Sequence, residues 1–298
     1  MNELKIARAK ILASMIIFGT LGLFTKTISL PSSLLASARG FIGVAFLLIF
    51  LVVRGKKISF SEMKNNALWL CLSGSAIGFN WIFLFESYRL TGVPTATLCY
   101  YLAPAIVVFV SPLILRERAE WVKLCAALVA LLGMVPISGV LSGGTLGGSG
   151  ILFGVAAAVL YASVILMNKK IHDISDYGRT VAQLLISAVV VLPYALLTSD
   201  LSAISLDAGD ILLTIAVGVL HTGIAYALYF SAMGLLSAQT TAILSYIDPV
   251  VAVFLSAAAA AVAPSVFSSE KLAITTIIGG VLILGSSLFA ETFEGRKK

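Results

Sequence analysis

Two stretches decide the fold of this chain: Thr95–Pro104 (TATLCYYLAP) and Thr240–Pro249 (TTAILSYIDP). The second is a partial copy of the first, with Thr, Tyr and Pro at matching positions. Pro249 follows Pro104 by 145 positions, which is close to half of the 298 residues. An offset of this size predicts that the chain consists of two related halves.

The composition is that of a protein embedded in lipid. Hydrophobic residues make up 59% of the chain and charged residues only 11%, whereas ordinary globular domains carry about 25% charged residues. The mean hydropathy is +1.05. Apolar stretches of about 20 residues, each long enough for a helix to cross the hydrocarbon layer, recur along the sequence. Helices satisfy their own backbone polar groups in lipid, and none of these stretches has the alternating polarity of a barrel strand.

The sequence therefore predicts an all-α polytopic membrane protein with ten transmembrane helices. Five spans per half is an odd number, so the second half enters the bilayer from the opposite side and the halves form inverted repeats. The spans are expected at residues 10–28, 33–53, 66–90, 94–115, 119–139, 149–168, 179–198, 209–233, 237–262 and 271–290.

We divide the chain into a first repeat (1–141), an external linker (142–150) and a second repeat (151–298). The linker is rich in Gly and uncharged, which is typical of a flexible connection. A phosphate-binding loop is the alternative for this segment. We disfavour it because no Lys-Ser/Thr pair follows the glycines and no strand precedes them.

The basic residues predict the orientation. With the N-terminus in the cytoplasm, 16 of the 20 Lys and Arg residues face inward and three face outward, as the positive-inside rule requires. Both termini are then cytoplasmic, and the net charge of +6 needs no nucleic-acid partner. The inward residues are Lys5, Arg8, Lys10, Arg54, Lys56, Lys57, Lys64, Arg116, Arg118, Lys123, Lys169, Lys170, Arg179, Arg296, Lys297 and Lys298, and the outward ones are Lys26, Arg89 and Lys271.

The sequence gives little support for a cleaved signal peptide or for a metal site. A signal peptide cleaved after Ala36-Ser37-Ala38 would delete the first span and break the five-plus-five symmetry. The three cysteines, Cys71, Cys99 and Cys125, fall inside expected spans without metal-ligand spacing. We expect neither a metal nor a cofactor.

Several short motifs recur in a similar order in the two halves. They are Phe18-Gly19-Thr20 with Lys26, Arg39-Gly40-Phe41, Phe85–Val93, Leu102–Pro104 and Glu117-Arg118 in the first half, and Tyr229–Met233, Ser245–Val250, Glu270 and Gly279 in the second. Together they resemble the motifs of EamA-type carriers of the drug/metabolite transporter superfamily. Two departures are Phe18, where the family often has Trp, and Asp248, where it often has Glu. The resemblance implies export or exchange of small metabolites, often amino acids or related compounds, across the cytoplasmic membrane.

Asp248 is the first candidate site residue, because an ionisable group at membrane depth is costly and is a functional hypothesis by default. Pro249 follows it and is expected to kink the helix. The carboxyl group could exchange a proton for substrate, bind a substrate cation, or serve as a structural partner. By their i, i+4, i+7 spacing, Thr241, Ser245 and Asp248 are expected on one helical face.

Aromatic and polar residues elsewhere in the spans extend the predicted site. The alternative to a binding role for these residues is packing against lipid or neighbouring helices. His221 is a second candidate for proton coupling, since imidazole titrates near neutral pH, although a lone His on an apolar helix is more often a packing residue. The expected substrate-binding residues are Asn80, Trp81, Tyr100, Tyr101, Tyr161, Tyr226, Thr241, Ser245, Tyr246 and Asp248.

Charged and proline residues are assigned structural or gating roles. Arg39 could snorkel, hold a structural carbonyl or carboxylate, or meet an anionic substrate, and we favour structure. Glu86 and Arg89 are three apart and are expected to form an intrahelical ion pair. The remaining residues of this group are Pro104 and Pro249.

The favoured function is alternating-access transport of a small molecule, with protons as a further coupling ion. An uncoupled facilitator or an importer of another solute stays open, because direction is not written in the sequence. An intramembrane enzyme is disfavoured, since no paired nucleophile and base or metal-ligand motif is present. A structural or receptor-like membrane protein is the other class. The zwitterion of an amino acid would satisfy both Asp248 and Arg39.

Overall fold

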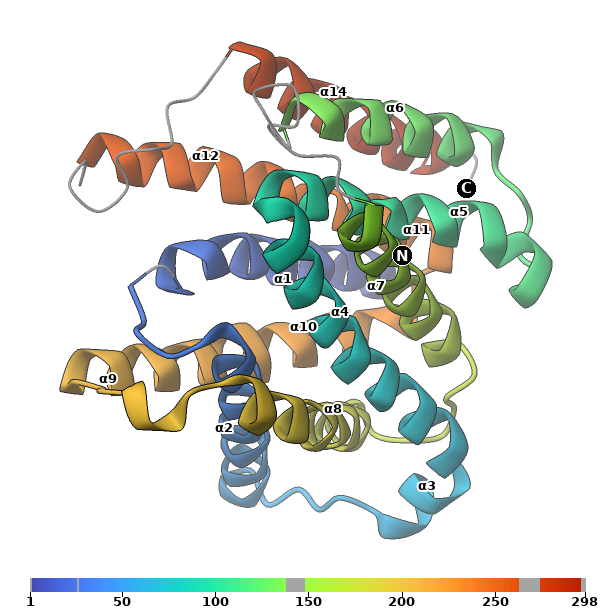
Figure 1. Ribbon diagram of the computed structural model, residues 1–298. Coiled ribbons are helices and arrows are strands. Elements are labelled where there is room, and N and C mark those ends of the chain that lie inside the picture. The colour runs from blue at the N-terminus through green and yellow to red at the C-terminus, as the bar shows by residue number, and fades with distance from the viewer. Residues whose placement is uncertain (1, 26, 138–147, 263–273, 296–298) are drawn as a thin grey trace.

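The chain folds into a bundle of helices (Figure 1). The computed structural model describes residues 2–25, 27–137, 148–262 and 274–295, and within these ranges there is no strand. Lys26, linker residues 142–147, Glu270 and Lys271 lie outside the described residues. The helices are α1 (Asn2–Thr25), α2 (Ser32–Val53), α3 (Phe60–Asn65), α4 (Ala67–Tyr100), α5 (Leu102–Leu115), α6 (Trp121–Ile137), α7 (Gly148–Asn168), α8 (Asp176–Thr198), η2 (Leu201–Ala203), α9 (Ala208–Ala216), η3 (Val217–Ile224), α10 (Ala225–Met233), α11 (Ala238–Ser245), α12 (Ile247–Val262) and α14 (Ile274–Gly295).

Eight helical segments in the described part of the chain are long and apolar enough to cross a membrane. Two shorter apolar helices, Trp121–Pro136 and Ile277–Ala290, accompany them. They lie side by side as parts of α6 and α14, at the top of Figure 1. The eight segments are Glu3–Thr25, Ser32–Val53, Ala67–Thr91, Thr95–Leu115, Gly148–Asn168, Asp176–Thr198, Ala208–Met233 and Ala238–Ala259.

The expected third and fourth spans, 66–90 and 94–115, agree with the apolar segments Ala67–Thr91 and Thr95–Leu115. The helix itself does not stop between these segments, because α4 continues for 34 residues to Tyr100. The interruption comes instead at Tyr101, between α4 and α5. Pro104 explains this position, because a proline ring clashes with the carbonyl four residues earlier, which is that of Tyr100.

The same rule places the interruption of the ninth span. Pro249 is expected to clash with the carbonyl of Ser245, and α11 ends at that residue. Tyr246 separates α11 from α12, and Pro249 lies in the first turn of α12, where its missing N–H would have no intrahelical partner. The kink predicted beside Asp248 is therefore present, but it lies three residues before the proline.

Glycines let the helices approach closely. A Cβ atom on Gly74 or Gly78 of α4 would come within 2.8 Å of Ile186 or Val190 of α8. A Cβ atom on Gly218 of η3 would lie 2.5 Å from Ile42 of α2. Small residues at such contacts are the usual means by which helices pack in lipid, where the hydrophobic effect does not drive them together.

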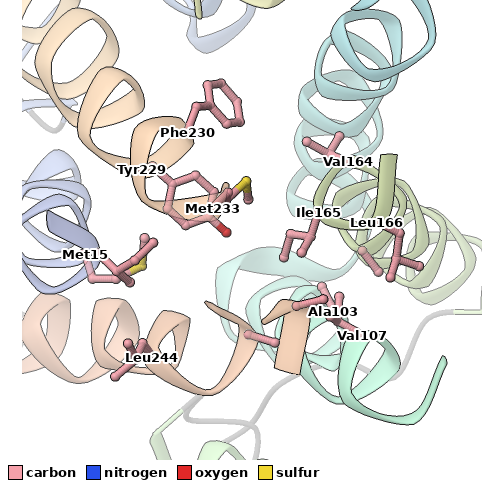
Figure 2. Close-up of a cluster of buried hydrophobic side chains, with 14 of the residues drawn as sticks. Met15, Ala103, Val107, Val164, Ile165, Leu166, Tyr229, Phe230, Met233 and Leu244 are labelled. Atoms are coloured by element: carbon pink, nitrogen blue, oxygen red, sulfur yellow. The ribbon is translucent and has the colours of Figure 1, made fainter. Parts of the chain in front are cut away.

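The largest cluster of buried apolar side chains joins helices from distant parts of the sequence (Figure 2). Met15 of α1, Leu244 of α11 and Phe230 of α10 belong to it, together with Ile165 of α7 and Val107 of α5. Figure 2 shows these residues pointing toward a common centre, with Tyr229 among them. Residues from both halves of the chain thus build one interior.

Candidate functional site

Asp248 lies in the first turn of α12, directly after the interruption at Tyr246. The hydroxyl group of Tyr101 donates a hydrogen bond to Asp248 Oδ2 at 2.9 Å. Tyr101 itself occupies the interruption between α4 and α5. The two helix breaks therefore meet through this hydrogen bond, and the positive end of the α12 dipole favours a carboxylate there.

A row of tyrosines continues from this bond. The rings of Tyr100 and Tyr101 lie 5.6 Å apart between centroids, and the ring of Tyr100 stacks on that of Tyr161 at 5.5 Å. The hydroxyl groups of Tyr161 and Tyr229 share a hydrogen bond of 2.8 Å. Tyr229 in turn lies 3.4 Å from the hydroxyl group of Ser245. Helices α4, α7, α10 and α11 thus contribute to one connected group.

A second aromatic group extends toward α1 and α2. The ring of Tyr226 lies 5.0 Å from that of Phe18 and 6.3 Å from that of Trp81, both edge-on. Phe18 also reaches Tyr229, at 6.3 Å. The guanidinium carbon of Arg39 lies 4.4 Å from the centroid of the Trp81 ring. We call Arg39, Trp81, Tyr100, Tyr101, Tyr161, Tyr226, Tyr229, Ser245 and Asp248 the central cluster.

Several members of the central cluster keep part of their surface accessible. Tyr100, Tyr101, Tyr161, Tyr226 and Asp248 are each half-buried. Polar groups and aromatic faces with accessible surface suit a ligand with both polar and apolar parts. A separate groove of about 540 Å³ runs along α6 and α14, lined mainly by apolar side chains such as Trp121 and Phe289.

The shared helical face expected for Thr241, Ser245 and Asp248 is wrong, because the spacing argument assumed one continuous helix. Ser245 closes α11 and Asp248 opens α12. The hydroxyl group of Ser245 also donates to the Thr241 carbonyl at 2.9 Å. Ser245 and Asp248 still belong to the central cluster, but through different tyrosines.

Two other expected binding residues have mainly protein partners. The amide of Asn80 donates to the backbone carbonyl of Ala157 at 2.6 Å and so ties α4 to α7. Tyr246 is fully buried in a cluster with Ala130, Met134 and Ile283. Both side chains therefore lie outside the central cluster as it is defined above.

His221 lies in η3, a π-helical segment within the eighth span. Thr20 Oγ1 donates to the carbonyl of Ile17 and lies 2.8 Å from His221 Nε2. The tautomer of the imidazole decides which of these two atoms is the donor. His221 Nδ1 is buried, and among the described residues it has no hydrogen-bond partner. The ring of Phe24 packs edge-on against the imidazole at 5.0 Å.

The ion pair predicted between Glu86 and Arg89 is confirmed. Arg89 Nη2 lies 2.6 Å from Glu86 Oε2. The hydroxyl group of Tyr194 on α8 donates to the other carboxylate oxygen, Glu86 Oε1, at 2.5 Å. This group links α4 to α8 near one end of the bundle, which agrees with a structural role.

Polar contacts hold the start of α11 to the segment between α5 and α6. Glu117 Oε1 accepts a hydrogen bond from the backbone N–H of Ala238 at 3.0 Å, and Gln239 donates to the Arg118 carbonyl at 3.0 Å. Lys123 is fully buried and donates to Thr240 Oγ1 at 2.8 Å. We call these six residues, together with Glu120, which bonds Lys123 at 2.9 Å, the α11 clamp.

Lys169 follows α7 at the same end of the molecule. Its ammonium group donates to the backbone carbonyls of Met233 and Leu236, just before α11 begins. Burial lowers the pKa of Lys169, and the negative charge of Glu117 opposes this shift. The segment that leads into α11 is therefore held by residues from three other helical regions.

Sequence reasoning left Phe18 and Tyr88 out of the expected site. Phe18 contacts Tyr226 and Tyr229, and Tyr88 lies within electrostatic range of Asp248. In the part of the chain that the structure describes, no group of three or more His, Cys, Asp and Glu residues could hold a metal ion.

A helical bundle with polar and aromatic groups at broken helices in its core is typical of a membrane transporter. The model of the EamA-like transporter family matches residues 6–139 and again residues 148–291. The chain therefore belongs to the EamA-like transporter family and is a multi-pass membrane transporter.

Relatives named as transporters cover nearly the whole chain. An uncharacterized transporter, YxxF, of Bacillus subtilis is 31% identical over 280 residues, which is 92% of this chain and 88% of the relative. An uncharacterized transporter of Archaeoglobus fulgidus is 25% identical over 288 residues, 96% of this chain and 97% of the relative. A solved crystal structure shares the fold, with a TM-score of 0.83 at 22% identity over 98% of both chains.

Proposed function

We propose that this transporter is a secondary carrier that exports or exchanges amino acids or related compounds across the cytoplasmic membrane by alternating access. Ten membrane helices form two inverted halves, residues 1–141 and 151–298, and both termini face the cytoplasm. Protons are the coupling ion. The observation that carries the proposal is the hydrogen bond from Tyr101 to Asp248, which joins the helix break of one half to that of the other.

The pattern of helix contacts supports the inverted halves. If the first five spans exchange places with the last five, the most extensive helix contacts are mapped onto one another or onto themselves. Helix α1 packs on α10 and α12, and its counterpart α7 packs on α4 and α5. Helix α2 packs on η3, and its counterpart α8 packs on α4. The pairs α2–α8, α5–α11 and α6–α14 join equivalent spans, as expected beside a twofold axis.

Individual side chains follow the same exchange. Ile186 packs against Gly74, and Ile42 packs against Gly218. Gly218 follows Gly74 by 144 positions, and Ile186 follows Ile42 by the same number. One helical turn later, Val190 packs against Gly78 and Phe46 packs against Gly223. Val190 follows Phe46 by 144 positions, but Gly223 follows Gly78 by 145.

The second half thus carries one extra residue between Gly218 and Gly223. The π-helical segment Val217–Ile224 covers this interval, and a π turn accommodates one more residue than an α turn. The same extra residue explains why Tyr246 and Pro249 follow Tyr101 and Pro104 by 145 positions. His221 lies within the extra turn, and π turns occur often at functional sites.

The Asp248 carboxyl group can tie or release the two helix breaks. When it is ionised, it accepts the Tyr101 hydrogen bond and benefits from the α12 dipole. When a proton or the cationic group of a substrate neutralises it, the charge-assisted bond weakens. Occupancy of Asp248 would then change how firmly α4 and α5 are joined to α12, which is a physical basis for coupling.

The aromatic rings around Asp248 suit the apolar part of a metabolite. Tyr and Trp faces bury carbon surface and attract cationic groups, while their polar atoms bind the polar end. Tyr100, Tyr161 and Tyr226 supply such faces from three helices. Relatives named as transporters favour transport over an enzymatic or receptor function.

Counterflow in proteoliposomes tests the proposed function. The purified full chain is reconstituted with unlabelled leucine, phenylalanine or threonine inside, and uptake of the labelled amino acid is followed. We expect saturable uptake above that of protein-free liposomes, reduced at least about tenfold by Tyr161→Ala. Tyr177→Ala is the matched control, because Tyr177 packs outside the central cluster against Phe50 and Lys56. Uptake no faster than in empty liposomes for all three would contradict the proposal.

A further inference from the structure

Arg39 is a buried cation without a counter-ion. It lies in α2 with 9% of its surface exposed, and its guanidinium group faces the ring of Trp81. Its Nε atom is fully buried without a hydrogen-bond partner. Within the described ranges, no carboxylate or carbonyl oxygen forms an ion pair or hydrogen bond with Arg39.

Such an arrangement is unfavourable for the empty protein. A guanidinium group keeps its charge at any pH that a cell reaches. Burial removes its hydration, and a single aromatic face offsets only part of that loss. A partner that supplies negative charge when it binds would restore the balance.

The other buried basic side chains have protein partners. Lys123 bonds Glu120 and Thr240, and Arg179 donates to the Phe230 carbonyl at 3.4 Å. Lys169 donates to two backbone carbonyls. Arg39 differs from all three, so burial in the bundle alone does not explain why its guanidinium group has no hydrogen-bond partner among the described residues.

The second half has no equivalent of this charge. With the 144-residue offset of α2 and α8, the counterpart of Arg39 is Gln183. Gln183 Nε2 donates to Ser73 at 2.5 Å and to Asn168 at 3.2 Å, so the donor group of this side chain is bound inside the protein. The interior therefore has a positive charge from the first half and none at the equivalent position of the second half, which suits a ligand with two different ends.

Arg39 and Asp248 flank the same aromatic residues. Tyr226 contacts Trp81, the ring beneath Arg39, and Tyr100 contacts Tyr101, the partner of Asp248. Tyr100 and Tyr226 each lie within electrostatic range of both charges. A cationic end and an anionic end thus face one group of tyrosines.

We propose that Arg39, held in place by the face of Trp81, binds the carboxylate of the transported compound. The inference rests on the proposed function and narrows its substrate to compounds with a carboxylate, with Asp248 receiving a cationic group at the other end. Arg suits this role because its fork of N–H donors binds both oxygens of a carboxylate at once.

Fluorescence of Trp81 reports on this site. The chain has three tryptophans, so a Trp69→Phe/Trp121→Phe protein emits from Trp81 alone. Leucine, phenylalanine and threonine are titrated against leucinamide, phenylalaninamide and threoninamide, which keep the amine and side chain but lack the carboxylate. We expect at least one amino acid to change the emission saturably and to bind at least about 30-fold more tightly than its amide.

Substitutions then assign the effect to Arg39. Arg39→Lys should weaken amino-acid binding at least about tenfold, and Arg39→Gln should remove the preference for acid over amide. Arg54→Gln is the control, because Arg54 also lies over an aromatic ring, that of Phe50, but at the exposed end of α2. The melting temperature without ligand should stay the same or rise in Arg39→Gln, since removal of a buried charge offsets the lost contact with the Trp81 ring.

Three results would overturn the inference. One is equal affinity for acid and amide in the protein with native Arg39, and another is an unchanged preference in Arg39→Gln. The third is a lower melting temperature of Arg39→Gln with acid and amide weakened equally, which is the signature of a structural arginine. In each case counterflow by the wild-type protein would leave the proposed function standing, whereas loss of both counterflow and binding would remove both proposals.

Discussion

The hydroxyl group of Tyr101 lies 2.9 Å from Asp248 Oδ2, and each residue stands at the break of a membrane helix. Tyr246 is the sequence equivalent of Tyr101 in the other half, yet it is buried beside Met134 and Ile283. Equivalent residues thus play different parts. The first half supplies the tyrosine of the bond and the second half supplies the carboxylate.

Tyr101→Phe removes this bond and leaves the ring. We expect the variant to fold, because the ring still packs against Tyr100, and to lose at least about tenfold in proton-driven transport. In an Asp248→Asn background, Tyr101→Phe should lower the transport rate little further, because the effects of substituting two partners of one hydrogen bond are not additive. Initial transport rates of the two single variants and the double variant measure the coupling. Full additivity would show that the bond has no role in transport.

Gly218→Ala places a methyl group 2.5 Å from Ile42 Cγ2. Overpacking of this kind costs about 1–3 kcal/mol, so the melting temperature should fall. Ile42→Ala should restore much of the loss in the double variant by making room. Gly74→Ala with Ile186→Ala should behave in the same way if the halves are equivalent. Rescue at one pair and not at the other would contradict that equivalence.

Deletion of Leu220 removes one residue from the π turn. The glycines at 218 and 223 then have the spacing of Gly74 and Gly78, so the helix can become regular without losing either contact with α2. We expect near-normal helix content by circular dichroism and a melting temperature within a few degrees of wild type. Transport should slow at least about tenfold, because the turn that carries His221 is lost. Unfolding of the variant would show that the offset argument is wrong.

Lys123→Met keeps the length of the side chain and removes its bonds to Thr240 and Glu120. The variant should lose about 1–3 kcal/mol of stability, because hydrogen bonds made by a charged group contribute about this much. Thermal unfolding in detergent measures the change. Lys64→Met is the control, since Lys64 is exposed. Equal melting temperatures for the two variants would show that the α11 clamp does not hold the helix.

Hydropathy predicted most of the helices, because a segment that crosses lipid must be apolar over about 20 residues. It placed the third and fourth spans within one residue of the apolar segments Ala67–Thr91 and Thr95–Leu115. It did not predict that α4 continues to Tyr100, because hydropathy marks a span and not the end of a helix. Pro104 lies four residues after that end, but Pro112 and Pro193 lie inside continuous helices, so prolines alone do not locate the breaks.

The central cluster was harder to predict than the spans. Tyr100, Tyr101, Tyr161, Tyr226 and Asp248 were expected in the site, and the structure brings them together. Their pairing depends on which faces of distant helices meet, and one sequence does not contain that information. Asn80 illustrates the difficulty, because its amide bonds a neighbouring helix in a way that composition does not distinguish from binding a ligand.

The most direct test of the account is substrate-driven proton movement in proteoliposomes that contain a pH-sensitive dye. Asp248→Asn is compared with the wild type, and Asp200→Asn serves as the control because Asp200 is exposed and caps the short η2 helix. We expect proton movement on addition of an amino acid in the wild type and the control, and none in Asp248→Asn. Proton movement at the wild-type rate in Asp248→Asn would contradict the central role of Asp248.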